Sequence, residues 1–158
     1  MNEGYDHTQY GWIHYLLALP AAGGIVSAFL SQEDATAFIF LIGVAVIFLV
    51  FGSCFVHLRV RDAGEGLEVR FGPIGVWGTT VRYEDMASAA VGRTTFWDGW
   101  GMHGWPGGSV IYNVSGRDCV IVTFKRPRGF LRFKLMKIGT DEPKALAAFL
   151  SSRIGQTE

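Results

Sequence analysis

The sequence predicts an α+β membrane protein, in which a two-helix transmembrane hairpin precedes an antiparallel β-barrel or sandwich capped by a C-terminal helix. Three observations predict this order. An uncharged stretch covers residues 35–56, alternating apolar and polar residues follow it, and apolar residues at helical spacing close the chain. We therefore expect an N-terminal segment with the hairpin at residues 1–56 and a cytoplasmic domain at residues 57–158.

The hairpin is predicted from two apolar segments. About 20 apolar residues in a helix cross the ~30 Å hydrocarbon layer of a bilayer, and residues 35–56 contain no charge. A buried helix of a soluble protein is the alternative, which the length of this run disfavours. The weaker segment, residues 12–30, contains Pro20, Gly23 and Gly24, which membrane helices tolerate better than soluble ones.

The orientation of the hairpin follows from charge. All 14 Lys and Arg lie from Arg59 onward, and the linker SQED at residues 31–34 carries two acids. Since basic residues flank the cytoplasmic ends of membrane helices, both termini are expected in the cytoplasm. A signal peptide is the alternative for the first segment, but it needs basic residues before its apolar part, and none is present. The predicted membrane-interface residues are Trp12, Tyr15, Trp77, Arg59 and Arg61.

The first span contains small residues at small-xxx-small spacing, which lets helix backbones approach closely. The residues with this spacing are Gly23, Gly24, Ser27 and Ala28. They indicate contact either with the other span or with a separate subunit, including self-association, and the sequence leaves both open.

Alternation with a period of two predicts about seven short antiparallel strands after the hairpin, each with one face in a core. Gly- and Pro-containing turns separate them. The predicted strands are residues 56–61, 67–71, 81–83, 86–93, 109–114, 119–124 and 131–135, with 86–93 either a separate strand or a bent continuation of the one before it.

A single amphipathic helix is predicted at the C-terminus. Thr140 is a suitable N-cap, and Pro143 is tolerated in the first turn. Leu146, Leu150 and Ile154 fall on one helical face. We expect this face to close the open end of the barrel.

The order of these elements resembles the bacterial pleckstrin-homology-like (PH-like) domain membrane proteins. The local cues are LEVRFGPIG, VRYEDMASAAV, GWGMHGWPGG followed by SVIYNVSGRDCVIVTFK, and IGTDEPKALAAFL. The resemblance implies a seven-stranded, helix-capped barrel on the cytoplasmic side of the bacterial inner membrane, with an adaptor role. In eukaryotic PH domains, phosphoinositide sites usually need Lys and Arg at the first hairpin. Here the turn at residues 62–66 carries two acids, which disfavours such a site.

No catalytic or cofactor signature is present. The four His and two Cys lack the spacing of zinc ligands, and Cys54 and Cys119 form no disulfide framework. The glycine-rich segment 99–108 leads into a strand rather than a helix, which disfavours nucleotide binding. Asp98 and His103 could be considered an acid–base pair, but no nucleophile accompanies them. We therefore expect neither an enzyme nor a bound cofactor or metal, and nucleic acid is a poor partner because acids are interspersed among the basic residues.

The stretch FWDGWGMHGWPGG at residues 96–108 holds three of the five tryptophans. Aromatic surface loops are typical of protein interfaces. The expected function is a non-enzymatic interaction or scaffold module, such as an accessory subunit of a membrane complex. Its candidate partner-binding residues are Trp97, Trp100, Met102, His103 and Trp105.

A basic hairpin supports the alternative function, peripheral sensing of anionic lipid. Its candidate residues are Lys125, Arg126, Arg128, Arg132 and Lys134, although a solvated turn would have the same composition. Chain direction adds a geometric expectation. The turn at residues 62–66 should lie away from the membrane, and the turn at 71–78, with Pro73, Ile74, Val76 and Trp77, should lie nearer the lipid than the aromatic stretch.

Overall fold

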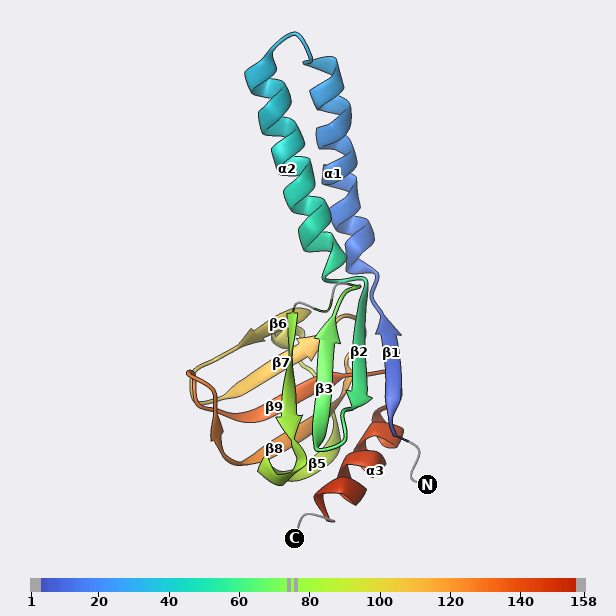
Figure 1. Ribbon diagram of the computed structural model, residues 1–158, viewed down its shortest axis with the longest axis vertical. Helices are drawn as coiled ribbons and strands as arrows, with labels where there is room; N and C mark the ends of the chain where they lie inside the picture. Colours follow the sequence, from blue (N-terminus) through green and yellow to red (C-terminus); the bar gives the residue numbers. More distant parts are fainter. Residues whose placement is uncertain (1–3, 74, 76, 156–158) are drawn as a thin grey trace.

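The computed structural model describes residues 4–73, 75 and 77–155. A helical hairpin projects from one end of a domain that contains two β-sheets, and the C-terminal helix lies at the opposite end (Figure 1). The elements are β1 Asp6–Tyr10, α1 Ile13–Leu30, α2 Ala35–Ser53, β2 His57–Asp62, β3 Gly66–Phe71, β4 Trp77–Arg82, the 3-10 turn η1 Tyr83–Asp85, β5 Met86–Arg93, the 3-10 turn η2 Phe96–Asp98, β6 Gly101–Gly104, β7 Ser109–Asn113, β8 Asp118–Arg128, β9 Phe133–Gly139 and α3 Pro143–Ile154.

The two hairpin helices pack against each other along small residues. A Cβ built on Gly24 would lie 3.3 Å from the Cβ of Ala45, and Ala28 is fully buried. Gly23 and Ser27 face away from α2, because Gly23 has no neighbour and Ser27 is exposed. Gly24 and Ala28 therefore serve contact between the two helices, which the sequence had left open.

Both helices are long and apolar enough to cross a membrane, and only 11% of the 18-residue apolar stretch in each helix is buried. A core helix of a soluble protein would be mostly buried, so this alternative is disfavoured. Helix α2 begins at a strong cap, where the Asp34 carboxylate accepts hydrogen bonds from the backbone of Thr36 and Ala37 at 2.9 and 3.1 Å. It ends at Ser53, three residues before the predicted end of the span.

The first sheet has four antiparallel strands in the order β1-β2-β3-β4. Strand β1 lies in the N-terminal segment, where the sequence analysis predicted no strand. Its residues DHTQY are polar, and among them only Gln9 is buried, so the strand has no apolar alternation to reveal it. Pairing of Asp6 with Arg61 and of Tyr10 with His57 adds β1 to the edge of the sheet.

The second sheet has five strands in the order β5-β8-β9-β7-β6. The prediction of a purely antiparallel arrangement was wrong at one position, because β7 and β9 are parallel. Strand β9 pairs with β8 on one side and accepts β7 on the other, so β7 must follow the direction of β9. The two sheets do not close into a barrel.

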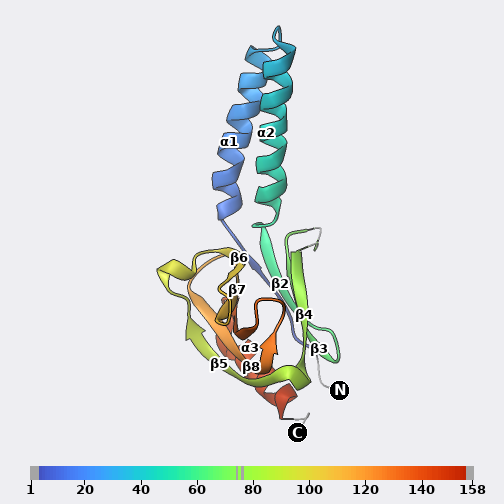
Figure 2. The same cartoon turned by 90° about the vertical axis from the view of Figure 1, so that its left-hand side faces the viewer.

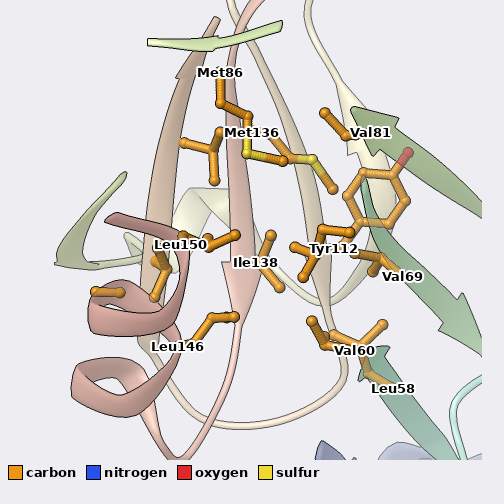
Figure 3. Packing of buried hydrophobic residues seen from close by; sticks show 14 of the residues in the cluster. Leu58, Val60, Val69, Val81, Met86, Tyr112, Met136, Ile138, Leu146 and Leu150 are labelled. Atoms are coloured by element: carbon orange, nitrogen blue, oxygen red, sulfur yellow. The ribbon is translucent and has the colours of Figure 1, made fainter. Parts of the chain in front are cut away.

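The core lies between the sheets and beneath α3. Figure 3 shows Leu146 and Leu150 of α3 pointing toward Ile138 of β9, with Met86 and Met136 nearby. Leu146 and Leu150 are fully buried, as the helical spacing predicts. The helix begins at Pro143 with Glu142 at the N-cap position, and Thr140 instead accepts a hydrogen bond from the Glu142 backbone N–H through its hydroxyl at 3.1 Å. The prediction of Thr140 as the N-cap was therefore wrong by two residues.

The two ends of the four-stranded sheet differ as chain direction predicts. At the hairpin end, Gly72 donates to the His57 carbonyl at 2.8 Å and packs against the Ser53 carbonyl. At the far end, the turn after β2 contacts α3 through an ion pair between Asp62 and Arg153. The turn at residues 62–66 thus lies away from the hairpin, and the start of the 71–78 turn lies beside it. Ile74 and Val76, two of the residues predicted to form its apolar tip, lie outside the described residues.

Candidate functional site: an aromatic surface beside the hairpin

The segment between β5 and β7 is fixed to the five-stranded sheet by one carboxylate. Asp98 accepts a hydrogen bond from the Thr95 backbone at 2.6 Å and forms an ion pair with Lys137 of β9 at 2.8 Å. Thr94 donates from its backbone to the Arg117 carbonyl at 2.7 Å. The loop that carries the first two tryptophans is therefore held at both its start and its middle.

Asp98 is a structural group in this arrangement. Burial raises the pKa of its carboxyl, but the hydrogen bonds from Lys137 and Thr95 and the charge of Lys137 outweigh burial and hold the pKa below its usual value. Among the described residues, the Asp98 carboxylate accepts hydrogen bonds from Thr95 and Lys137 and shares none with His103. The geometry gives no support to an acid–base pair.

The predicted aromatic residues separate into two groups. Trp97 is 90% exposed and lies edge-on to the neighbouring Phe96, and Trp105 is 74% exposed in the β6–β7 turn. Trp100 and Met102 are about half as exposed and lie at the base of the hairpin. Since none of the three tryptophans in the segment is fully buried, the segment is not a simple plug of the core.

A cavity of about 310 Å³ occupies the space between the base of α2 and the β4 and β6 edges of the two sheets. The strand order leaves these two edges unpaired with each other. The size and mainly apolar lining are typical of ligand or side-chain pockets. The lining residues are Phe51, Cys54, Phe55, Phe71, Trp77, Trp100, Gly101, Met102 and His103.

The cavity brings together residues predicted separately. Trp77, predicted at the membrane interface, shares it with the partner-binding candidates Trp100, Met102 and His103. Gly101 has φ of +99°, and a Cβ there would lie 3.2 Å from the ring of Phe55. Glycine therefore allows β6 to approach the end of α2 closely.

The aromatic segment lies at the hairpin end of the domain, contrary to the expectation that it lies farther from the lipid. The ring of Trp100 is 5.8 Å from that of Trp12, at the start of α1, in an edge-on contact. Figure 2 shows β6 on the hairpin side of the domain, with α3 at the other end. The reason is that Met86–Arg93 is a separate strand that returns toward the hairpin rather than a continuation of β4.

The basic hairpin contains an exposed aromatic residue that the sequence analysis missed. Phe130, in the β8–β9 turn, is 100% exposed, and Leu131 beside it is partly exposed. Arg128 is committed elsewhere, since its guanidinium pairs with Asp85 at 2.7 Å. The Leu131 carbonyl accepts a hydrogen bond from Gly107 at 2.7 Å, which holds this turn beside the β6–β7 turn. An apolar residue between KRPR and RFK is the signal that could have identified it.

The basic tip, which we define as Lys125, Arg126, Arg132 and Lys134 around Phe130, is therefore amphipathic. A cavity of about 550 Å³ adjoins it, lined in part by Pro106, Pro127, Phe130 and Leu131 together with Arg132 and Lys134.

The remaining interface candidates lie at the base of the hairpin. Trp12 and Tyr15 are exposed at the start of α1. Arg59 and Arg61 lie on β2 and are each paired, Arg59 with Asp6 and Arg61 with Glu68. They are thus parts of an ordered charged surface rather than isolated basic residues.

In the described part of the chain, candidate metal ligands do not gather at one place, and both cysteines are free. No group of three or more His, Cys, Asp or Glu there could hold a metal ion. Cys54 and Cys119 are both free. Burial raises the pKa of the Cys119 thiol to about 11, which leaves it protonated and unreactive at neutral pH.

No protein-family model matches the chain, and no curated protein matches it.

Proposed function

We propose that this chain is a non-enzymatic interaction or scaffold module, held at the cytoplasmic face of a bacterial inner membrane by its hairpin, which binds a protein partner through the aromatic segment. The observation that carries the proposal is Trp97, whose side chain is 90% exposed on a loop fixed by the Asp98–Lys137 ion pair. A large apolar side chain kept in water by an ordered loop is typical of an interface residue.

Several features support the membrane placement. At ~1.5 Å per residue, the 19 residues of α2 extend about 28 Å, close to the thickness of the hydrocarbon layer. Trp12 and Tyr15 are exposed at the base of the hairpin, where aromatic residues favour the interface. Arg59 and Arg61 follow α2 on the domain side, which supports a cytoplasmic domain. The order of elements, in which a helical hairpin is followed by strands and a closing helix, also supports membership of the PH-like family as part of this proposal.

The shape of the aromatic surface supports a protein partner. Trp97 and Trp105 provide protruding apolar groups, and the cavity beside Trp100 can receive an apolar side chain from the partner. Interfaces commonly combine protruding aromatic residues with pockets that are filled on binding. The partner is either another membrane protein or a second copy of this chain. The exposed Gly23 and Ser27 of α1 leave a small-residue face available for helix contact.

Site-specific photocrosslinking in native membranes tests the proposal. A photoreactive amino acid at Phe96, which is 78% exposed, should give an adduct of one defined mass. Replacement of Trp97 by Ala should reduce that adduct at least about tenfold, because an interface hot spot contributes ~2 kcal/mol or more. An adduct of twice the chain mass would identify the partner as a second copy.

Two controls make the experiment decisive. Tyr10→Ala removes an aromatic residue of similar exposure from β1 and should leave the adduct unchanged. A photoreactive residue at Lys144 on α3, at the far end of the domain, should not give the same adduct. The proposal fails if the adduct survives Trp97→Ala at full yield, or if position 144 gives it equally.

Peripheral sensing of anionic lipid stays as a second candidate function because of the basic tip. A fully exposed Phe130 among four basic residues combines an apolar residue that can enter the interface with charges that attract anionic headgroups. A test of this tip requires the full chain, since a fragment beginning at residue 57 would lose β1 from the first sheet.

A further inference from the structure

The outer face of the four-stranded sheet holds a cluster of charged residues near the hairpin. Leu58 and Val60 of β2 and Val69 of β3 point into the core, so the residues between them point outward. The outward-facing residues of these two strands are His57, Arg59, Arg61, Glu68 and Arg70.

The strand register places two arginines directly opposite each other. Arg59 pairs with Arg70, and Arg61 pairs with Glu68. Like charges opposite each other on neighbouring strands are destabilising unless an anion compensates them. The carboxylates present are Glu68, which bonds both Arg61 and Arg70, and Asp6 of β1, which bonds Arg59. Three guanidinium groups therefore share two carboxylates, and the cluster keeps a positive charge.

The cluster lines an open polar cavity of about 370 Å³ on the surface of the sheet. The Arg70 side chain lies along one side of the cavity, where its Nη1 donates a hydrogen bond to the Gly75 carbonyl at 2.9 Å. The cavity adjoins the base of the hairpin, because Gly72 packs on the Ser53 carbonyl at the end of α2. The lining residues are His57, Arg59, Arg61, Glu68, Arg70 and the turn residues Gly72, Pro73 and Gly75.

We propose that this cavity binds the phosphate group of an anionic membrane lipid, with Arg59 and Arg70 as its principal contacts. The inference rests on the proposed membrane placement of the hairpin, which puts the hairpin end of the cavity, at His57 and Gly72, at the depth of the lipid headgroups.

Arg59 donates to Asp6 through Nε and Nη2, and Arg70 donates to Glu68 through Nε and to the Gly75 carbonyl through Nη1. The remaining Nη N–H groups of the two planar guanidiniums are the donors that would meet phosphate oxygens. Basic pockets on the cytoplasmic side of membrane helices have the location and charge that recognise such headgroups.

His57 can add one hydrogen-bond donor to the site. Burial, together with the charge of Arg59, lowers the pKa of its imidazole, so that it is neutral at neutral pH without a ligand. A neutral imidazole can still donate one hydrogen bond. The groups that face it include Arg59 and the exposed ring of Tyr10, whose centroid is 6.0 Å from that of His57.

Native mass spectrometry of the full chain in detergent tests the site. Titration with phosphatidylglycerol should give one retained lipid per chain, while phosphatidylcholine, which has no net charge, should be retained much less. Arg70→Gln should weaken phosphatidylglycerol retention roughly fivefold or more, and Arg70→Lys should weaken it less, because charge remains but the fork is lost. Lys125→Gln with Arg126→Gln is the matched control from the basic tip and should leave this lipid bound.

A gain-of-binding variant separates the proposal from simple misfolding. Glu68→Gln removes the carboxylate that competes for Arg61 and Arg70, and should tighten phosphatidylglycerol retention severalfold. Inorganic phosphate at millimolar concentration is the second probe. If it binds as tightly as the lipid, the site takes free phosphate, and the lipid source is wrong. If Arg70→Gln and Glu68→Gln both leave lipid retention unchanged, the cavity is not the site.

Alkaline extraction of membranes distinguishes failure of this inference from failure of the membrane placement. A chain released by alkaline carbonate is not anchored by its hairpin, which would overturn the placement and this inference together. A chain that stays in the membrane with unchanged lipid binding in the Arg70 variants overturns the phosphate site alone.

Discussion

The two sheets have different relations to the hairpin. The four-stranded sheet is joined to it directly at two places, since β1 precedes α1 and β2 follows α2. No strand of the five-stranded sheet precedes or follows the hairpin directly along the chain, and this sheet and its loops carry the exposed Trp97, Trp105 and Phe130. We infer a division of roles in which the first sheet fixes the domain to the hairpin and the second presents the contact surface.

Two aspartates with little exposed surface, Asp62 and Asp98, form ion pairs that fix different elements of the domain. Asp62 of β2 bonds Arg153 of α3 and the Tyr83 hydroxyl, so it connects the sheet to the closing helix. Asp98 bonds Lys137 and fixes the aromatic loop. Loss of the first should affect the whole domain, whereas loss of the second should affect the loop alone.

The largest effect is expected for Asp62→Asn. Its side chain is 7% exposed, and the substitution leaves Arg153 without its charged partner. Charge-assisted hydrogen bonds contribute about 1.5–3 kcal/mol, so the free energy of unfolding at pH 7 should fall by about this amount. Thermal unfolding in detergent, followed by tryptophan fluorescence, measures it. Glu84→Gln, which breaks an exposed pair with Arg82, is the control and should change little.

The effect of Asp62 should depend on pH in a defined direction. Burial raises the pKa of its carboxyl, but the hydrogen bonds from Tyr83 and Gly64 and the charge of Arg153 lower it further than burial raises it. The folded pKa thus lies below the unfolded value of about 3.9, and the stabilisation is complete above that value. It is lost as pH falls through the folded pKa. The difference between wild type and Asp62→Asn should shrink at acid pH, and a constant difference would contradict this role.

An intermediate effect is expected for Asp98→Asn, confined to the aromatic loop. The change removes the ion pair with Lys137 but leaves the core untouched, so local opening should become easier by about 1–2 kcal/mol. Hydrogen exchange measured by mass spectrometry should accelerate at residues 94–100 and stay unchanged in β2 and β3. Asp118→Asn, which breaks an exposed pair with Arg93, is the matched control. Acceleration across both sheets would contradict the division of roles.

The sequence predicted the elements whose apolar pattern is regular. The hairpin, the C-terminal helix and most strands follow from uninterrupted or alternating apolar residues, because burial against a core requires that pattern. Strand β1 escaped prediction because it is a polar edge strand whose only buried residue is Gln9. The parallel pairing of β7 with β9 depends on the order of strands in space, which alternation along the chain does not encode.

The sequence allowed us to predict which residues form the candidate site, but not where they lie in the fold. The concentration of tryptophan marked the segment, yet its position depended on whether Met86–Arg93 was one strand or a continuation of another. Because Met86–Arg93 has few large apolar residues, the sequence left that choice open. The charged cavity could not be foreseen because it depends on the register that places Arg59 opposite Arg70. Pairing partners across a sheet are set by turn geometry and packing together, beyond what local sequence specifies.

The smallest effect on stability, and the sharpest test of the contact surface, is expected for the basic tip. Lys125→Gln with Arg126→Gln replaces two exposed residues and should change the free energy of unfolding by less than about 0.5 kcal/mol. If the tip senses anionic lipid, the same change should weaken its association with phosphatidylglycerol vesicles added to nanodisc-embedded protein, by ~1 kcal/mol for each charge at low salt. Phe130→Ser should weaken it further without altering salt dependence, since Phe130 supplies apolar contact rather than charge. Vesicle association that is absent in wild type, or unchanged by these substitutions, would overturn lipid sensing by the tip.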